Sequence, residues 1–359
     1  MHLAKLVSAA AFAHQAIAGA AAAAADLSNF DEWEHGRVAL QDVSIHFRYA
    51  GKGPPVLLVH GNPQFSLTWQ TIGPILAAHN YTVIAPDNRG AGDSSIPPDG
   101  NYSAAASAAD LEGVLESLNV TRAYVLAHDK GVGIAAALAL RNPALARRLA
   151  LVEYPLPGFG YEQAATPAAF WDLYQNPQLA IFQVPDLAEF LINGREKAFL
   201  EWYFYHGSYS GVTAFSEDTV NRYATSISKP GFLRAMLGPF AAATVADDAA
   251  FFKGSLAGGP LDVPVLAMGG EASLGIESDL RQSFSPVSNN LEVDVVPKAG
   301  HWIADENPVW VANRVLKFLA EDTSPPPAVD LSYLKDLVTL KVGYYGTYRN
   351  AALGGYVPS

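Results

Sequence analysis

The chain has 359 residues, half of them hydrophobic, which is enough for a large packed core. Its balance of 23 basic against 35 acidic side chains gives a formal net charge of -12, which argues against binding to nucleic acid or anionic lipid. The absence of cysteine excludes disulfides, thiol catalysis and cysteine-bound metals.

The first 25 residues have the pattern of a secretion signal. Lys5 places a positive charge near the start, residues 6–25 are mostly small and apolar, and Ala-Gly-Ala at 18–20 suits a cleavage site. Two polar residues interrupt the apolar run, so a disordered alanine-rich arm is the alternative. We expect a signal peptide at residues 1–25 and a secreted or secretory-pathway protein. No other stretch reaches the roughly 18 apolar residues of a membrane span.

Short apolar runs alternate with helical patterns over the first part of the chain. Residues 38–50 alternate like a hairpin, and residues 56–59 form a wholly apolar run that is typical of a buried parallel strand. Further strands are predicted at 81–85, 123–127 and 149–152, and helices at 67–78, 103–118 and 131–141. This order predicts an α/β fold with a doubly wound, mostly parallel sheet.

The alternation stops at residue 154 and resumes at residue 263. Residues 154–252 are rich in aromatic side chains at helical spacing and contain no obvious buried strand. We therefore expect a core of residues 26–153 and 253–322, with strands at 263–268 and 291–296 and a helix at 308–319. The helical block should form a cap over the carboxyl ends of the strands, where such sheets bind ligands. A proline run begins a C-terminal extension, residues 323–359, whose role the sequence does not indicate.

The segment Ala-His-Asp-Lys-Gly at residues 127–131 lies between a predicted strand and a predicted helix. This is the setting of a nucleophile elbow, with Asp129 where serine is usual. Ala127 and Gly131 are small enough for the sharp turn, and the helix N-terminus favours an ionised carboxylate. The alternative is that Asp129 is an ordinary helix N-cap.

Two further segments would complete such a site. His-Gly-Asn-Pro at 60–63 follows the first central strand, where the amides of Asn62 and Lys130 would form an oxyanion hole; a plain β-turn is the alternative. Gly-His at 300–301 follows the last strand and would place His301 over the elbow. An orienting carboxylate is also needed. Glu153 and Glu271 both end predicted strands, so the residues leave both open.

Residues 30–320 resemble the branch of the α/β-hydrolases that contains epoxide hydrolases and haloalkane dehalogenases. Four segments carry the resemblance, at residues 60–63, 87–94, 127–131 and 300–301. It implies the α/β-hydrolase fold, a helical cap after strand 6, and an alkyl ester on Asp129 that is hydrolysed by water activated by His301. Members with glutamate in a context like Val-Glu-Tyr-Pro use it as the charge-relay acid, which favours Glu153 over Glu271.

The expected cap departs from the pattern of this branch. Epoxide hydrolases protonate the leaving oxygen with two cap tyrosines, or with a histidine and a tyrosine. An approximate alignment puts Gln178 and Phe240 at these positions, and phenylalanine has no proton to donate. Other cap residues that have a donor group are Tyr154, Tyr161, Tyr174, Tyr203, Tyr205, His206 and Tyr209.

The features expected of dehalogenases are also incomplete. Asn62 stands where haloalkane dehalogenases bind halide, but Lys130 replaces their second halide ligand, a tryptophan. Fluoroacetate dehalogenases have arginine at this position and a second arginine where this chain has Gly133. Lys130 is therefore expected either to hold a substrate carboxylate or to lie on the surface.

We predict a hydrolase that acts on a small, mostly apolar electrophile with water and needs no metal or organic cofactor. Epoxide hydrolysis is the first prediction, and dehalogenation of haloalkanes or haloacids is the second. A catalytically silent small-molecule binder is the third, because the fold does not fix the function. Gln178, Phe240 and Tyr154 are the predicted substrate contacts, and the oligomeric state is left open.

Overall fold

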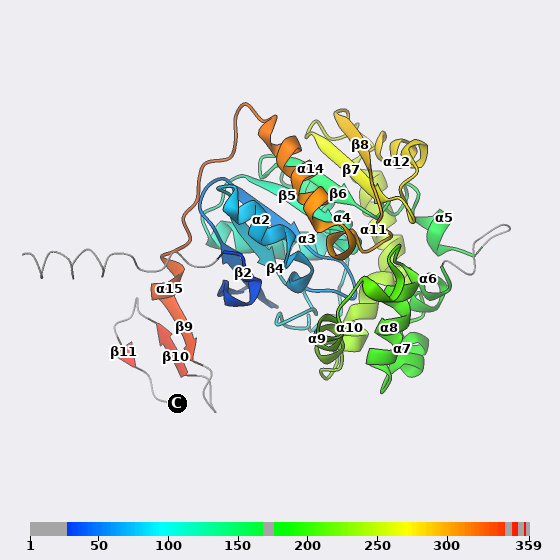
Figure 1. Ribbon diagram of the computed structural model, residues 1–359, viewed down its shortest axis with the longest axis horizontal. Coiled ribbons are helices and arrows are strands. Elements are labelled where there is room, and N and C mark those ends of the chain that lie inside the picture. Colours follow the sequence, from blue (N-terminus) through cyan, green and yellow to red (C-terminus); the bar gives the residue numbers. More distant parts are fainter. Residues whose placement is uncertain (1–26, 168–175, 342–346, 351–354, 357–359) are drawn as a thin grey trace, which may run out of the picture.

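A computed structural model describes residues 27–167, 176–341, 347–350 and 355–356 of the chain. Its centre is an eight-stranded sheet with the order β1-β2-β4-β3-β5-β6-β7-β8 (Figure 1). The strands are β1 (Glu34–Ala39), β2 (Ser44–Ala50), β3 (Pro55–Val59), β4 (Thr82–Pro86), β5 (Ala123–His128), β6 (Ala146–Val152), β7 (Val265–Gly270) and β8 (Leu291–Val296). Antiparallel pairing joins β1 to β2 and β2 to β4, and all other pairs are parallel. The predicted fold class is confirmed.

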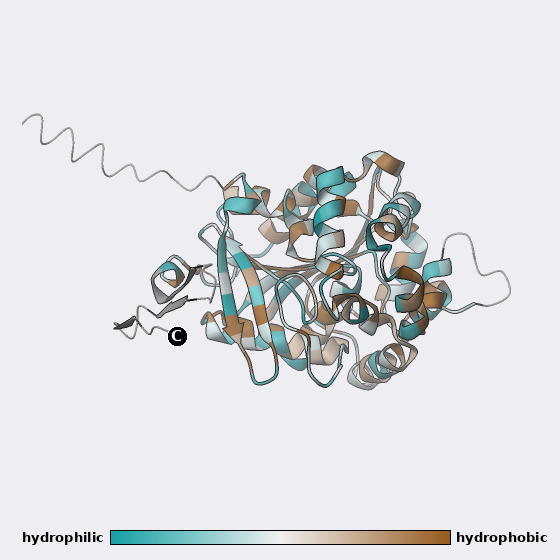
Figure 2. Cartoon of the chain, turned by 90° about the horizontal axis from the view of Figure 1, so that it is seen from below, coloured by the Kyte–Doolittle hydropathy of each residue, from teal (hydrophilic) through white to brown (hydrophobic). Residues whose placement is uncertain are grey.

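Helices cover both faces of this sheet. One face packs against α2 (Ile72–Ala78) and α14 (Pro308–Ala320), and the other against α3 (Ala104–Ser117) and α4 (Lys130–Arg141). Every residue of β3 and β5 is therefore buried, which explains their wholly apolar runs. Polar and apolar stretches alternate along the outer helices, as expected for helices with one buried face (Figure 2). Shorter helices on the core are η1 (Phe30–Glu32), η2 (Ser66–Trp69), α12 (Glu277–Phe284) and α13 (Ile303–Glu306).

Two predicted elements differ from the structure. The helix expected at 67–78 is divided into η2 and α2, with Pro74 in the first turn of α2, where a missing N–H costs nothing. The hairpin expected at 38–50 begins at Glu34, because the whole of β1 pairs with β2. The outward positions of β1 are exposed and the strand starts with polar residues, so its first residues do not have the apolar pattern from which a strand is predicted.

A helical insertion, defined here as α5 to α11 with the short turns between them, connects β6 to β7. Its elements are α5 (Tyr161–Ala165), α6 (Pro177–Phe182), α7 (Pro185–Ile192), α8 (Glu196–His206), η3 (Gly211–Thr213), α9 (Glu217–Ile227), α10 (Phe232–Leu237), η4 (Gly238–Phe240) and α11 (Ala242–Ser255). Helices α7 to α10 gather at one side of the molecule (Figure 1). Tyr203 and Phe204 of α8 pack against Trp302 with ring centroids 5.3 and 4.9 Å away. The insertion therefore shares its apolar packing with the loop that follows β8.

The described part of the C-terminal extension runs back along the first strands. Val329 bridges to Gly53, and the Asp330 carboxylate lies 3.0 Å from the Lys52 ammonium. Beyond it, α15 (Leu334–Leu337) precedes a small antiparallel sheet of β9 (Val338–Lys341), β10 (Thr347–Asn350) and β11 (Gly355–Tyr356). The predicted signal peptide, residues 1–25, lies outside the described residues. Within the part of the chain that is described, no helix has the length and apolar character to cross a membrane.

Candidate active site

Asp129 lies in a sharp turn between β5 and α4. Its backbone has φ 49° and ψ -132°, a conformation that non-glycine residues rarely adopt outside functional sites. Asp129 occupies the N-cap position of α4, but its side chain makes no capping hydrogen bond, so it is not an ordinary N-cap. A Cβ atom on Gly131 would lie 2.4 Å from the carbonyl oxygen of Val59, which shows why the turn needs glycine there. The Asp129 carboxylate is therefore not used to cap α4 and remains available to react.

Backbone amides bind this carboxylate from two sides. The Asn62 amide donates to Asp129 Oδ1 over 2.8 Å, and the adjacent Lys130 amide contributes to lowering the pKa of Asp129. These are the two amides expected from the sequence. Paired amides at a carboxylate stabilise negative charge on its oxygen, which is what a tetrahedral intermediate on Asp129 would require.

His301 joins Asp129 to a second carboxylate. Its Nε2 atom lies 3.5 Å from Asp129 Oδ2, and its Nδ1 atom lies 2.9 Å from Glu153 Oε2. Glu153 is fixed in turn by the Gly270 amide at 2.5 Å and the Ser273 hydroxyl at 2.7 Å. Glu271 is exposed and accepts a hydrogen bond from the Lys298 amide instead. The structure thus places Glu153, and not Glu271, against His301.

The charges in this group shift each other's pKa values. Burial alone would lower the pKa of His301, but hydrogen bonds to Asp129 and Glu153 raise it to about 10. Burial would raise the pKa of Asp129, but the hydrogen bond and charge of His301 hold it below its usual value. At neutral pH the free site therefore contains an ionised Asp129 beside a protonated His301.

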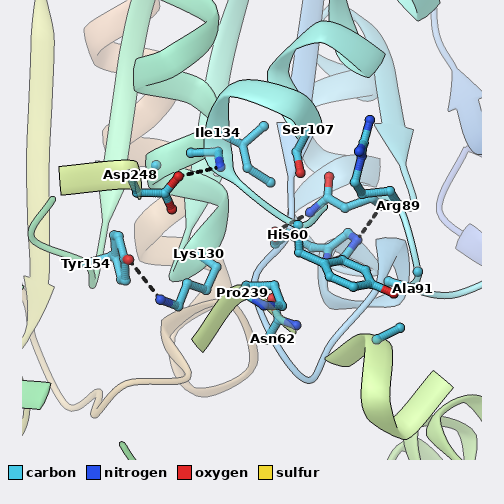
Figure 3. A pocket seen from close by; sticks show the side chains of 16 residues that line it. His60, Asn62, Arg89, Ala91, Ser107, Lys130, Ile134, Tyr154, Pro239 and Asp248 are labelled. Atoms are coloured by element: carbon cyan, nitrogen blue, oxygen red, sulfur yellow. Dashed lines mark hydrogen bonds between the residues drawn. The ribbon is translucent and has the colours of Figure 1, made fainter. Parts of the chain in front are cut away.

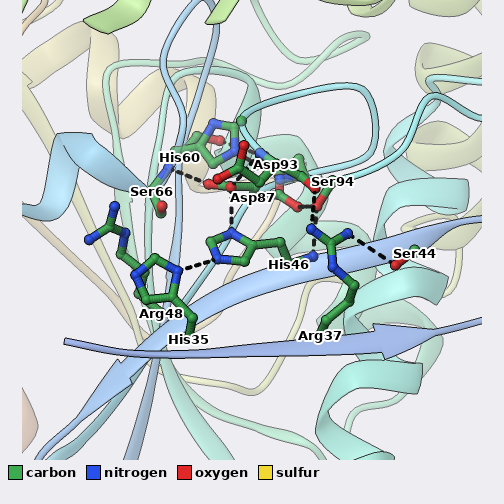
Figure 4. Close-up of polar contacts among 12 residues, drawn as sticks. His35, Arg37, Ser44, His46, Arg48, His60, Ser66, Asp87, Asp93 and Ser94 are labelled. Atoms are coloured by element: carbon green, nitrogen blue, oxygen red, sulfur yellow. Dashed lines mark hydrogen bonds and ion pairs between the residues drawn. The ribbon is translucent and has the colours of Figure 1, made fainter. Parts of the chain in front are cut away.

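A chain of polar contacts fixes the loop that carries Asn62 (Figure 4). His60 Nε2 accepts the Asn88 amide at 2.8 Å, and the neighbouring Asp87 binds His46 Nδ1 at 2.7 Å and the Ser66 amide at 2.8 Å. Together with Asp93, His46 and Asp87 also form a group whose possible metal-ligand atoms lie within 4.8 Å of one another. Because hydrogen bonds already occupy both oxygens of Asp87, we assign this group a structural role.

Lys130 is 5% exposed, so the surface interpretation of its side chain is wrong. Its ammonium donates to the hydroxyl oxygens of Tyr154 at 3.0 Å and Tyr161 at 3.2 Å, and lies 4.5 Å from the centre of the Phe240 ring. Burial lowers the pKa of Lys130 to about 8, although the charges of Asp129 and Asp248 oppose this. The residue after the candidate nucleophile therefore carries a buried cation, close enough for the charge of Asp129 to raise its pKa.

A small cavity of about 30 Å³ adjoins this cation (Figure 3). The polar residues around it include His60, Asn62, Lys130, Tyr154 and Asp248. Asp248, on α11, accepts the Ala104 amide at 2.8 Å, and burial raises its pKa to about 6. Sequence analysis missed Asp248 because a lone acidic residue on a predicted cap helix looks like any surface carboxylate.

Several known hydrolases are similar in sequence to this chain. A family model described as the alpha/beta hydrolase fold matches residues 54–308. The soluble epoxide hydrolase of Corynebacterium sp. (strain C12) is 31% identical over 292 residues, covering 80% of this chain and 98% of that protein. The fluoroacetate dehalogenase of Burkholderia sp. is 27% identical over 302 residues, covering 82% and 96%.

The chain belongs to the α/β-hydrolase family. Solved structures agree: that of Cfl2 from Burkholderia cenocepacia superimposes with a TM-score of 0.72 and 30% identity, covering 79% of this chain and 95% of that one. The predicted resemblance to the epoxide hydrolase branch is confirmed, and the chain is a hydrolase.

The predicted substrate contacts of this α/β-hydrolase lie in different surroundings. Tyr154 lines the cavity, whereas Phe240 is 1% exposed and packs against Phe182 with ring centroids 5.1 Å apart. Gln178 is buried at the start of α6. Among the other hydroxyl groups weighed, Tyr205 and Tyr209 are exposed and Tyr203 is buried among aromatic rings, while Tyr174 lies outside the described residues. Tyr154 and Tyr161 are the two that reach Lys130.

Proposed function

We propose that this hydrolase opens epoxides through a covalent ester on Asp129. The observation that carries the proposal is the position of the Asp129 carboxylate, with Oδ1 on the Asn62 amide and Oδ2 3.5 Å from a histidine held by Glu153. A serine at this position would form an ether with the substrate. Water could not hydrolyse this ether, because it has no carbonyl carbon to attack. The Corynebacterium relative, named a soluble epoxide hydrolase, supports the same reaction.

In the first step, an oxygen of Asp129 attacks a ring carbon of the epoxide. The carbon–oxygen bond of the ring breaks, its electron pair goes to the ring oxygen, and protonation gives a hydroxyalkyl ester. The amides of Asn62 and Lys130 hold the other carboxylate oxygen in place. Asp129 is ionised before the attack, since its pKa lies below the usual value.

In the second step, water attacks the carbonyl carbon of the ester. Esterification removes the negative charge of Asp129, which is one of the causes that raise the pKa of His301. That pKa therefore falls once the ester has formed, and the imidazolium releases its proton to solvent. The neutral imidazole then takes a proton from the attacking water while Glu153 stabilises the imidazolium that forms. The amides stabilise the tetrahedral oxyanion, typically by ~3 kcal/mol for each donor.

Replacing His301 with glutamine tests the ester directly. The variant should form the ester but fail to hydrolyse it, so intact-protein mass should rise by the mass of the epoxide. Peptide mapping should place the adduct on Asp129. Hydrolysis that continues unchanged in Asp129→Ala would overturn the proposal, and an inert wild type with no adduct from any electrophile would favour a binding protein.

Dehalogenation is the second candidate function. The Burkholderia relative, named a fluoroacetate dehalogenase, favours it. Against it, the Met236 carbonyl oxygen takes one of the two side-chain N–H groups of Asn62, the expected halide ligand, at 2.8 Å and leaves one for a halide. An adduct from alkyl halides but not from epoxides in His301→Gln would reverse the order of the two candidates.

A further inference from the structure

Opening an epoxide requires a proton for the ring oxygen, and the expected donors are missing. The approximate alignment with epoxide hydrolases puts Gln178 and Phe240 at the two donor positions of the insertion. A phenylalanine ring donates no proton, and an amide has negligible acidity. If the proposed function holds, another buried group near these positions must supply the proton.

The Lys130 ammonium lies beside Phe240, which occupies one of the two expected donor positions. It is 4.5 Å from the centre of the Phe240 ring and 4.3 Å from the centre of the Tyr161 ring. Its residue follows Asp129 in the elbow, and its own backbone amide holds the Asp129 carboxylate. The cation therefore comes from the core of the fold, whereas the resemblance to epoxide hydrolases implies donors on the insertion.

Hydrogen bonding leaves this ammonium one free donor. Lys130 has three N–H groups, and two of them point to the hydroxyl oxygens of Tyr154 and Tyr161. Within the described ranges the structure gives the third N–H no acceptor. Both tyrosine oxygens act as acceptors here, so the hydroxyl hydrogens point away from Lys130. Lys130 and Tyr154 line the same cavity of about 30 Å³, together with Asn62, whose amide binds Asp129 (Figure 3).

We propose that Lys130 is the proton donor for epoxide opening and that Tyr154 and Tyr161 hold its ammonium in place. As Asp129 forms its bond to the ring carbon, the ring oxygen takes the electron pair of the breaking bond and a proton from Lys130 Nζ. The products of this step are a neutral lysine amine and a hydroxyalkyl ester. Hydrolysis of the ester to carboxylate and diol releases one proton, which restores the ammonium.

The charges around Lys130 select uncharged substrates. The groups that face it are Asp129 on the elbow, Asp248 on α11, and the hydroxyls of Tyr154 and Tyr161 after β6. The ammonium already faces the carboxylates of Asp129 and Asp248, so a substrate carboxylate would have to compete with both for this cation. We therefore infer that neutral epoxides are preferred to halocarboxylates.

The acidity of Lys130 suits this role. General acids work best when their pKa lies near the working pH, and burial lowers the pKa of Lys130 to about 8. Below pH 8 the ammonium carries its proton, so ring opening should proceed at its full rate. Above pH 8 the donor is lost, and the rate of ester formation should fall about tenfold per pH unit.

The test measures ester formation on Asp129 in the His301→Gln background, with and without Lys130→Met. Methionine keeps the length of the buried chain and removes the proton. Styrene oxide needs a proton to open, whereas 1-bromobutane does not, because bromide leaves as an anion. We expect Lys130→Met to slow the styrene oxide adduct at least 100-fold, to change the bromide adduct less than fivefold, and to abolish the fall in rate above pH 8.

Two further variants make the outcome specific. Lys253→Met, on the exposed side of α11, should leave both rates unchanged. Adding Phe240→Tyr to Lys130→Met restores a hydroxyl beside the vacated position and should recover part of the epoxide rate. Equal epoxide rates with and without Lys130→Met, or equal losses on both electrophiles, would overturn the inference while the ester mechanism stands. Absence of any adduct in His301→Gln alone would overturn the proposed function and the inference together.

Discussion

At the scale of single residues, Lys130 is held in a site that opposes its charge. Burial in an aromatic pocket lowers its pKa from 10.5 to about 8, and its hydrogen bonds go to neutral tyrosines. Proteins retain such groups where function requires them, since an apolar residue of similar volume is usually more stable in the same place. The stability of the fold should therefore report on Lys130 independently of activity.

Lys130→Met should raise the thermal stability at pH 7. The folded protein binds the Lys130 proton less tightly than the unfolded chain does. The ionisation of Lys130 therefore destabilises the wild-type fold at low pH, and this destabilisation disappears as the pH rises from 8 to 10.5. Below pH 8 the destabilisation is at its largest, and the pKa shift from 10.5 to about 8 corresponds to at most about 3 kcal/mol of unfolding free energy. Calorimetry across pH should show a higher Tm for the variant at pH 7, and a difference that shrinks towards pH 10. A lower Tm at pH 7 would mean that the aromatic contacts outweigh desolvation.

Glu153 and Glu271 offer a matched pair of substitutions. Glu153→Gln keeps the shape of the side chain but removes the carboxylate charge that faces His301 Nδ1. Hydrolysis of the ester should therefore slow by ~10³–10⁴-fold, and the adduct should accumulate. Glu271→Gln changes an exposed side chain that binds the Lys298 amide and should leave turnover unchanged. Steady-state rates and intact mass of both variants would decide the assignment, and the reverse pattern would refute it.

At the scale of elements, the elbow depends on close contact between β3, β5 and the start of α4. Gly131 packs directly against the carbonyl of Val59, and a Cβ atom on Gly61 would lie 2.4 Å from Asp129 Cβ. Neither glycine has φ in the left-handed region, so it is space and not backbone freedom that requires them. Glycine at these two positions thus allows the backbone of the loop after β3 to lie against the elbow after β5.

Gly131→Ala should destabilise the fold by about 3 kcal/mol, because the clash is with backbone that cannot rotate away. Gly254→Ala is the matched control: it lies in α11 with nothing within 4 Å of the added Cβ atom. That change should stabilise the protein by up to about 1 kcal/mol. Urea unfolding of the two variants measures both effects, and similar midpoints would show that the turn tolerates the extra methyl group.

At the scale of the whole molecule, the site forms where the sheet and the insertion meet. His301 is held by both, because its amide donates to the Gly207 carbonyl at 2.7 Å while its own carbonyl accepts from His128 Nε2 at 2.7 Å. Lys130 reaches from α4 to tyrosines beyond β6, and Asp248 comes from α11. Loosening the insertion should therefore disturb the histidine and the cation together.

We also propose that residues 1–25 direct secretion. A tagged full-length chain should then be recovered from the medium of a secreting host, with its start between residues 21 and 26. A chain that lacks residues 1–25 should stay inside the cells with its activity intact. Recovery of uncut full-length protein from the cytoplasm would contradict the proposal.

The sequence by itself determined the order of strands and helices, the elbow at Asp129, the amides of Asn62 and Lys130, and the position of His301. These features depend on local patterns, because buried parallel strands and tight turns need particular residues in succession. The acid partner and the surroundings of Lys130 were decided by the tertiary structure. Glu153 and Glu271 both follow strands, and only the course of the chain beyond each strand turns Glu153 towards His301. Lys130 is buried by rings 24 and 31 residues further along the chain, a distance at which no local pattern operates.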